Sequence, residues 1–340
     1  MSIPPLRSSR LRVTLFQFRP FCNSDPPQLA SIWRGQPPQR GVLQPVSVPL
    51  LEQRVFSKPY FDRHGLIVGT VNKEPVGFVH ASFGPDDQQS GLCTEVGATQ
   101  LLMVRSEYAD SELPLALLAQ GEQYLRKKGA KVLYAGGIYP LNGFYLGLYG
   151  GSELPGVLSS DPLDHWVRTF GYQEIDRVII FQRNLATFKP DSSRKQRQLR
   201  REFVFCKKWA PPSNNWWEAC TTGGQDRIEY GLLKGRGGPR VASVRFWDVE
   251  PLASGWGLRT AGVSDLYVEP EYRRRGLAIS LLTQAFKQLI LQGITLIESQ
   301  TMHFNHPAIS LYGELGFKAV DCGYVFRKES TTSNRTSLGS

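Results

Sequence analysis

The sequence lacks the features that would place it in a membrane or in an oxidising compartment. No stretch approaches the roughly 20 apolar residues that a membrane-spanning helix needs. Segment 1–12 has no apolar run of signal-peptide length. The five cysteines are scattered and form no CxxC pair, which indicates neither a disulfide framework nor a zinc site. We therefore expect a cytoplasmic protein with no membrane partner.

Patterns for binding metals and nucleic acids are also missing. His64, His80 and His165 show no metal-ligand spacing, so no metal is predicted. Part of the net charge of +10 comes from one basic run around residues 186–208. Such a charge attracts anions, but the run has neither interleaved stacking aromatics nor a nucleic-acid motif. It favours a solvated linker, and nucleic acid is not expected as a partner.

Two parts of the chain repeat the same order of elements. At 340 residues the chain exceeds the usual size of one hydrophobic core. Segments 65–83 and 227–249 both have the pattern of a β-hairpin. Leu113–Lys128 and Leu277–Gln292 both have helical periodicity and are followed by a glycine. The sequence therefore predicts two copies of one mixed α/β unit.

The stretch from Val268 to Ala278 carries the strongest chemical signal. A strand is predicted to end at Val268, because Pro270 cannot continue it, and Gly276 opens into an amphipathic helix. Such a turn directs backbone N–H groups and a helix N-terminus toward one point, which favours a pyrophosphate. Gly276 lets a phosphate approach the backbone closely, and the neighbouring arginines add charge-assisted hydrogen bonds.

A second motif occupies Asn305–Phe317. Helical spacing places Ala308, Leu311 and Tyr312 on neighbouring positions, and Gly316 ends the helix. This arrangement allows Tyr312 to face a bound ligand.

Together the two motifs resemble those of the GNAT superfamily of N-acetyltransferases. The family's Arg/Gln-x-x-Gly-x-Gly/Ala hallmark is matched by Arg273–Ala278, and its distal Asn, Ala, Leu-Tyr and Leu-Gly-Phe pattern by Asn305–Phe317. The close match covers residues 260–327, whereas the first half resembles the family only in layout. The resemblance implies an α/β fold with a splayed mixed sheet and acetyl-CoA, the acyl donor, between two parted strands.

The resemblance also implies which residues contact the cofactor. Backbone groups of Leu266, Tyr267 and Val268 would bond the pantetheine as an added strand does. The pyrophosphate would lie on the turn formed by Arg273, Arg274, Arg275, Gly276, Leu277 and Ala278. Asn305 stands where the family commonly has a cofactor-contacting asparagine. Tyr312 matches a cofactor-binding tyrosine that often protonates the departing CoA thiolate.

The reaction needs a base for the acceptor amine and a hydrogen-bond donor for the developing oxyanion. Asp265 is the preferred base, because many relatives carry an acidic residue here beside the thioester. The alternation of a strand also puts Asp265 on the face opposite Leu266. Glu298 and His303, near the other parted strand, remain alternatives.

The first unit lacks both the glycine-containing turn and the tyrosine. Its turn, Ala109–Pro114, has Glu112 in place of Gly276. An acidic side chain at a pyrophosphate site repels the ligand. Val167 stands in place of Tyr312. We therefore expect the first unit to be non-catalytic.

These observations predict two tandem acyl-CoA N-acyltransferase (GNAT-like) domains. The expected segments are a disordered N-terminus (1–10), a degenerate GNAT-like domain (11–185), a basic linker (186–200), a catalytic GNAT domain (201–328) and a disordered tail (329–340). A Gly/Tyr-rich insertion at 136–158 in the first domain is expected to cover the interdomain cleft and help form the acceptor pocket. Trp216, Trp217, Trp247 and Trp256 are interpreted as core residues, with a role in lining the substrate pocket as the alternative.

The expected function is N-acetylation by direct attack of an amine acceptor, a small molecule or a peptide, on acetyl-CoA in a ternary complex. A non-catalytic acyl-CoA-binding sensor or scaffold is an alternative, motivated by the degenerate half. Acetylation of RNA or of a nucleic-acid-bound protein is another, motivated by the basic run. The sequence predicts neither the acceptor nor the oligomeric state.

Overall fold

The computed structural model describes residues 15–190 and 193–329. The predicted disordered segments 1–10 and 329–340 lie outside these ranges, except for Glu329. The first half contains β1 (Gln17–Pro20), α1 (Pro26–Arg34), α2 (Val48–Leu51), β2 (Leu66–Val71), β3 (Glu74–Pro85), β4 (Leu92–Val104), α3 (Leu113–Lys127), β5 (Val132–Ala135), β6 (Val157–Leu158), α4 (Pro162–Thr169) and β7 (Gln173–Asn184).

The second half repeats this order in outline, with a helix added between its second and third hairpin strands and no counterpart of β6. It contains α5 (Arg194–Glu202), β8 (Phe203–Trp209), α6 (Trp216–Thr222), β9 (Arg227–Lys234), β10 (Arg240–Asp248), α7 (Glu250–Trp256), β11 (Thr260–Val268), α8 (Leu277–Leu291), β12 (Leu296–Met302), α9 (His306–Glu314) and β13 (Lys318–Glu329). The helix starts at Leu113 and Leu277 confirm the repeat predicted from the sequence. None of the helices in the described ranges has the length and apolarity to cross a bilayer.

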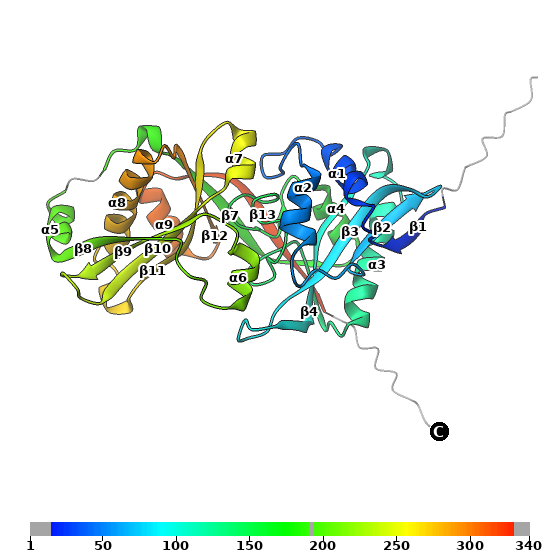
Figure 1. Cartoon of the computed structure of the whole chain (residues 1–340), viewed down its shortest axis with the longest axis horizontal. Coiled ribbons are helices and arrows are strands. Elements are labelled where there is room, and N and C mark those ends of the chain that lie inside the picture. Colours follow the sequence, from blue (N-terminus) through cyan, green and yellow to red (C-terminus); the bar gives the residue numbers. More distant parts are fainter. Residues whose placement is uncertain (1–14, 191–192, 330–340) are drawn as a thin grey trace, which may run out of the picture.

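The strands of the described residues join into one 13-stranded mixed sheet. Its order is β1-β2-β3-β4-β5-β13-β7-β12-β11-β10-β9-β8, with β6 paired to β13. Figure 1 shows this sheet running the length of the molecule, with β7 and β13 at its centre. The predicted mixed α/β class is confirmed.

The two units exchange their last strands. β7, which closes the first unit in sequence, pairs antiparallel with β12 of the second unit. β13, which closes the second unit, pairs antiparallel with β5 of the first. β7 and β13 also pair with each other. Each half of the sheet is therefore completed by a strand from the other half, an arrangement that the linear domain boundaries do not anticipate.

The expected linker at 186–200 differs from the structure. Ser193 caps the helix α5, its hydroxyl accepting a hydrogen bond from the Gln196 N–H. Leu199 on α5 is buried in the hydrophobic core of the C-terminal half. An apolar residue in a largely charged helix anchors that helix to the core, so residues from 194 onward belong to the C-terminal unit.

A third hydrophobic core lies between the two units. It combines α1 and α2 with insertion residues such as Phe144 and Tyr149, and with Trp217 and Trp247 of the second half. Burying such large aromatic side chains contributes roughly 1.5–3 kcal/mol each. The insertion thus packs the two halves together at the level of the parted strands.

Candidate active site

The strands β11 and β12 separate after a short parallel ladder. They pair only from Thr260↔Leu296 to Gly262↔Glu298. Beyond Gly262, β11 continues with β10 on one side, and no strand of the described residues lies on the other. The parted strands implied by the family resemblance are therefore present. The backbone of Leu266–Val268 has an edge free for an extended ligand.

A β-bulge marks the point where the strands part. In the β10–β11 ladder, Arg245 faces Ser264 while Ser243 faces Tyr267, so two residues of β11 oppose one of β10. Asp265, within this bulge, has a φ of 50°, in the left-handed region that is unusual outside glycine. The bulge turns the Asp265 carboxylate into a pocket.

The arginine-rich turn follows the C-terminal end of β11. Gly276 has a φ of 89°, which L side chains rarely adopt, and it directly precedes α8. A Cβ on Gly276 would lie 3.3 Å from Cε of Lys195 on α5. Arg273 Nε donates to the Val268 carbonyl over 2.9 Å, which fixes the turn onto the strand end. A glycine cradle with surrounding cations fits a diphosphate.

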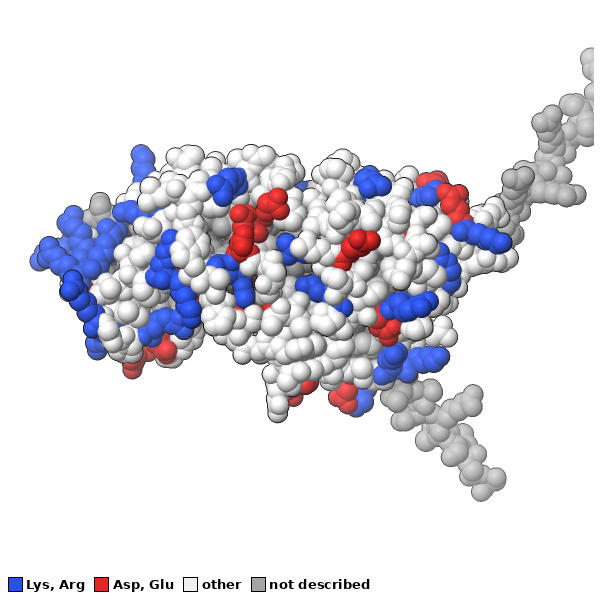
Figure 2. Space-filling model, in the orientation of Figure 1, with Lys and Arg blue, Asp and Glu red and all other residues white. Residues whose placement is uncertain are grey.

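Lys and Arg side chains gather at this end of the molecule. Figure 2 shows the concentration at the end where Figure 1 places α5 and β8. Arg275 forms a 3.0 Å ion pair with Glu202, the last residue of α5. The basic run interpreted as a solvated linker therefore lies beside the candidate pyrophosphate site, and adds positive potential there.

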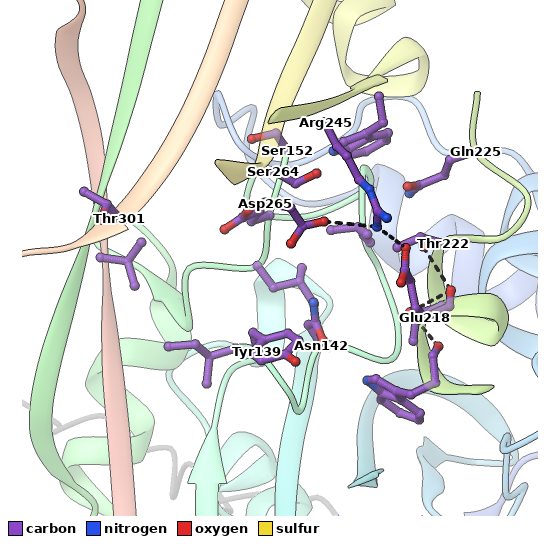
Figure 3. A pocket seen from close by; sticks show the side chains of 18 of the residues that line it. Tyr139, Asn142, Ser152, Glu218, Thr222, Gln225, Arg245, Ser264, Asp265 and Thr301 are labelled. Atoms are coloured by element: carbon purple, nitrogen blue, oxygen red, sulfur yellow. Dashed lines mark hydrogen bonds and ion pairs between the residues drawn. The ribbon is translucent and has the colours of Figure 1, made fainter. Parts of the chain in front are cut away.

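A pocket of about 710 Å³ lies where the strands part, lined by Asp265 of β11 and by Thr301 and Met302 at the end of β12. It is lined from the C-terminal half by Asp265, Arg245 and Glu218, and from the N-terminal insertion by Tyr139 and Glu153. Figure 3 shows the labelled polar side chains directed toward this space from several elements. Trp217 and Trp247 are both core residues and pocket walls, so the two interpretations of these tryptophans hold together.

Asp265 is placed in this pocket as the sequence suggested, with 65% of its side chain exposed to the open space. Desolvation is the largest effect on its carboxyl group and raises the pKa; the nearby Glu218 adds to the rise, and Arg245 opposes it. Arg245 Nη1 lies 3.4 Å from the Asp265 carboxylate and 2.8 Å from that of Glu218 (Figure 3). Arg245 thus holds the acidic groups of this wall in place.

Tyr312 lies on α9 and is 5% exposed. Its hydroxyl accepts a 2.6 Å hydrogen bond from Ser299 Oγ on β12. Burial raises the pKa of Tyr312 to about 12. The phenol therefore keeps its proton at neutral pH, as an acid that donates to a thiolate must.

Asn305 has a structural task as well as a place in the pocket lining. It caps α9, its side-chain oxygen accepting from the Ala308 N–H over 3.3 Å. Its amide nitrogen donates to Thr301 Oγ1 over 3.0 Å. The structure places Asn305 in the lining of the pocket.

Residues 197–317 match the family model described as the Acetyltransferase (GNAT) family. The C-terminal half is a GNAT domain. No curated protein matches the chain.

Solved structures extend the likeness to both halves. A GCN5-related glucosamine N-acetyltransferase region of a fungal multi-domain GH3 beta-N-acetylglucosaminidase is 18% identical with a TM-score of 0.69, covering 94% of this chain and 38% of that one. A tandem GNAT protein from the clavulanic acid biosynthesis pathway is 14% identical with a TM-score of 0.63, covering 93% of this chain and 98% of that one. A GCN5-related N-acetyltransferase from Sphaerobacter thermophilus is 14% identical with a TM-score of 0.57, covering 92% and 95%. The chain has the fold of a tandem GNAT protein.

Glu298 and His303, the two alternative bases near β12, interact with side chains outside the pocket. Glu298 is fully buried and accepts hydrogen bonds from Arg40 (2.8 Å), Gln182 (2.7 Å) and the Ser152 N–H (2.7 Å). It joins β12 to the first half of the chain. His303 is exposed and lies 2.6 Å from Asp176. Neither residue lines the pocket.

Glu153 is a pocket residue that sequence reasoning did not single out. It lies in the insertion of the N-terminal half, 112 residues before Asp265 in the chain, and lines the same pocket. Burial is the main cause that raises the pKa of Glu153, to about 8, and the negative charges of Asp265 and Glu298 add to the rise. The signal in the sequence was the insertion itself, expected to cover the cleft.

The corresponding space in the N-terminal unit is filled. At its own bulge, Gln100 is buried and its amide donates to the Leu141 carbonyl of the insertion over 2.8 Å. A Cβ on Gly137 would lie 2.8 Å from the Gln100 side-chain oxygen. Val167, at the place of Tyr312, is fully buried in the core. The insertion that closes this site is the one that lines the pocket of the other.

Proposed function

We propose that this chain is an N-acetyltransferase that transfers the acetyl group of acetyl-CoA to the amine of a small polar acceptor, in its C-terminal half. The observation that carries the proposal is the path along β11. It begins at the cationic turn around Gly276, follows an unpaired strand edge, and ends at the pocket that contains Asp265. A diphosphate, an extended pantetheine and an acceptor each match one part of this path.

Acetyl-CoA would supply an activated acyl group at the junction of β11 and β12. In the proposed assignment Arg273–Ala278 bind the diphosphate, and the backbone of Leu266–Val268 bonds the pantetheine. Tyr312 holds a proton for the departing sulfur, and Asp265 binds the acceptor nitrogen. The direct-attack mechanism requires that the acetyl group and the acceptor amine meet, which this assignment puts beside Asp265.

The pocket favours a small acceptor over a peptide or RNA. Its volume of about 710 Å³ is typical of small-molecule sites. Asn142, Asn215 and Gln225 in its lining offer amides that both donate to and accept from hydroxyl groups. The fungal protein of similar fold is described as a glucosamine N-acetyltransferase region. A hydroxylated amine of the amino-sugar class is therefore the first acceptor to test.

Calorimetric titration of the full chain with acetyl-CoA tests the donor assignment, and saturable binding is expected. Turnover is then measured with glucosamine and a panel of other amines as the release of CoA thiol. A reaction without amine corrects for the five cysteines of the chain. Absence of acetyl-CoA binding would contradict the proposal. Tight binding without turnover on any amine would instead indicate an acyl-CoA sensor.

A further inference from the structure

Glu153 enters the pocket from a loop that is held rigidly against β12. The Ser152 N–H donates to Glu298 over 2.7 Å. The Gln300 amide donates to the carbonyls of Gly150 and Glu153, over 3.0 and 2.9 Å. These bonds fix the backbone on both sides of Glu153, so its side chain is presented to the pocket by a scaffold rather than by a free loop.

The carboxylate of Glu153 has no partner among the described residues. The pocket arginines are engaged elsewhere: Arg245 binds Glu218 and Asp265, and Arg227 binds Glu218. A partly buried carboxylate that lacks a cation or donor is costly to the fold. Such a group is typically retained where a ligand supplies the missing partner.

The groups that face Glu153 explain its proton affinity. Asp265 on β11 and Glu298 on β12 are acidic, and Tyr312 on α9 is close enough for its pKa to respond to Glu153. Arg40 neutralises Glu298 over 2.8 Å but makes no ion pair with Glu153. Glu153 therefore lies near Asp265, which is assigned to the acceptor nitrogen, and near Tyr312, which is assigned to the leaving sulfur.

We propose that Glu153, supplied by the non-catalytic half, is the general base that takes a proton from the acceptor amine in the GNAT half. This inference rests on the proposed function. The acceptor enters as an ammonium ion between Asp265 and Glu153 and gives one proton to Glu153. The neutral nitrogen bonds to the acetyl carbon as the carbon–sulfur bond breaks. The sulfur takes a proton from Tyr312, the second proton of the nitrogen returns to Tyr312 through solvent, and Glu153 releases its proton to solvent.

Asp265 is the weaker candidate for this step. It is 3.4 Å from Arg245, and this cation favours the ionised form and opposes the rise that burial causes in the pKa of Asp265. Glu153 has no such neighbour, and a base whose pKa is close to the working pH is the more effective one. The assignment gives the retained N-terminal unit a direct part in the chemistry.

A titration that needs no acceptor tests the inference first. Carboxyl groups of ¹³C-labelled glutamate are followed by NMR from about pH 4 to about pH 9 in the full chain. One resonance, absent from Glu153→Gln, should titrate with a midpoint near 8. A midpoint in the ordinary range of exposed glutamates would overturn the inference, whether or not the protein is active.

Turnover then tests the role. With glucosamine, or whichever amine of the panel reacts, Glu153→Gln should lower kcat about 10²-fold, as loss of a general base does. The wild-type rate should fall as the pH drops below about 8, because Glu153 becomes protonated. This decrease should be absent from the variant, whose remaining pH dependence is that of the protonation of the amine. Glu95→Gln, an exposed carboxyl of the first half, is the matched control.

Measuring acetyl-CoA binding distinguishes a failure of the proposed function from a failure of the role assigned to Glu153. Wild type and Glu153→Gln should bind acetyl-CoA equally in calorimetry, because Glu153 lies at the acceptor end. If neither binds, the proposed function fails. If both bind and the variant turns over like wild type with an unchanged pH profile, the function stands and Glu153 is removed from it.

Discussion

Gly276 adopts a φ of 89°, directly before α8 and beneath Lys195. Gly276→Glu or Arg274→Glu would put a carboxylate where a diphosphate is expected, so acetyl-CoA affinity should fall at least about ten-fold, or roughly 1.4 kcal/mol. Calorimetry measures this. Gly257→Glu is the control for strain, because Gly257 also has a positive φ, of 66°, with no atom near its Cβ. Unchanged affinity in both turn variants would contradict the assigned turn.

Tyr312 offers a hydroxyl that can be removed while its ring remains packed. Tyr312→Phe should keep the fold and acetyl-CoA binding, while turnover falls about 10²-fold if the phenol is the proton donor. Steady-state kinetics at saturating substrate measure it. Tyr230→Phe removes another buried hydroxyl, which accepts from Gln292 over 3.2 Å, and should keep wild-type turnover. Full activity of Tyr312→Phe would leave water as the acid.

Glu153 also links pH to stability. Burial raises its pKa to about 8 in the folded protein, whereas an unfolded glutamate titrates near about 4.3. Between these values the folded state binds a proton that the unfolded state has lost, so stability falls as pH rises through the window, and the loss is complete above it.

Glu153→Gln cannot ionise and should escape this loss. Its Tm should exceed that of wild type by at least about 2 °C near pH 9 and differ little near pH 4. Thermal unfolding across the pH range, with Glu95→Gln run in parallel, measures it. A variant that is less stable than wild type at high pH would show that Glu153 is not strained by its burial.

At the scale of elements, the exchange of β7 and β13 makes each half depend on the other. Residues 200–340 alone lack β7, which leaves the edge of β12 bare over the segment Leu296–Met302. A bare central strand edge promotes aggregation. This fragment should therefore be insoluble or poorly active on its own.

Co-expression of 1–199 with 200–340 as separate chains should rescue the fragment, because the exchanged strands pair across the two pieces. Co-purification followed by an acetyl-CoA titration measures the rescue. If residues 200–340 alone are soluble and fully active, the first half is dispensable and the exchange has no energetic importance.

At the scale of the whole molecule, the two units contribute different parts to the proposed site. The second keeps the turn and Tyr312, and the first keeps the scaffold and contributes the insertion that lines the pocket. In the first unit Asp110 and Glu112 occupy the turn, and Gln100 seals the bulge by bonding to Leu141. Like charge and a filled groove both disfavour a second diphosphate ligand.

One chain should therefore bind one acetyl-CoA. The stoichiometry of a calorimetric titration measures this, and Gly276→Glu should weaken the single binding event rather than halve the number of sites. Two equivalent sites per chain would contradict the assigned division of tasks.

The sequence by itself determined the local motifs, such as the glycine-containing turn, and the repeat of elements. Helical periodicity, the glycine at 276 and the strand-ending Pro270 act over a few residues, so their consequences can be predicted without knowing the fold. The motif around Arg273–Ala278 and the mixed α/β class were predicted in this way. Asp265 was expected at the parted strands, and the structure places it there.

Only the tertiary structure decided which parts meet. Strand exchange could not be predicted, because β7 and β13 have equivalent patterns and either could close either sheet. The pocket combines Asp265 with Glu153, 112 residues apart in the chain, and no local pattern reports such a distance. The protonation state of Glu153 depends on burial and on the charges of Asp265 and Glu298, which lie on two other elements. These are properties of the assembled fold, since the desolvation and the neighbouring charges exist only once the two halves have packed together.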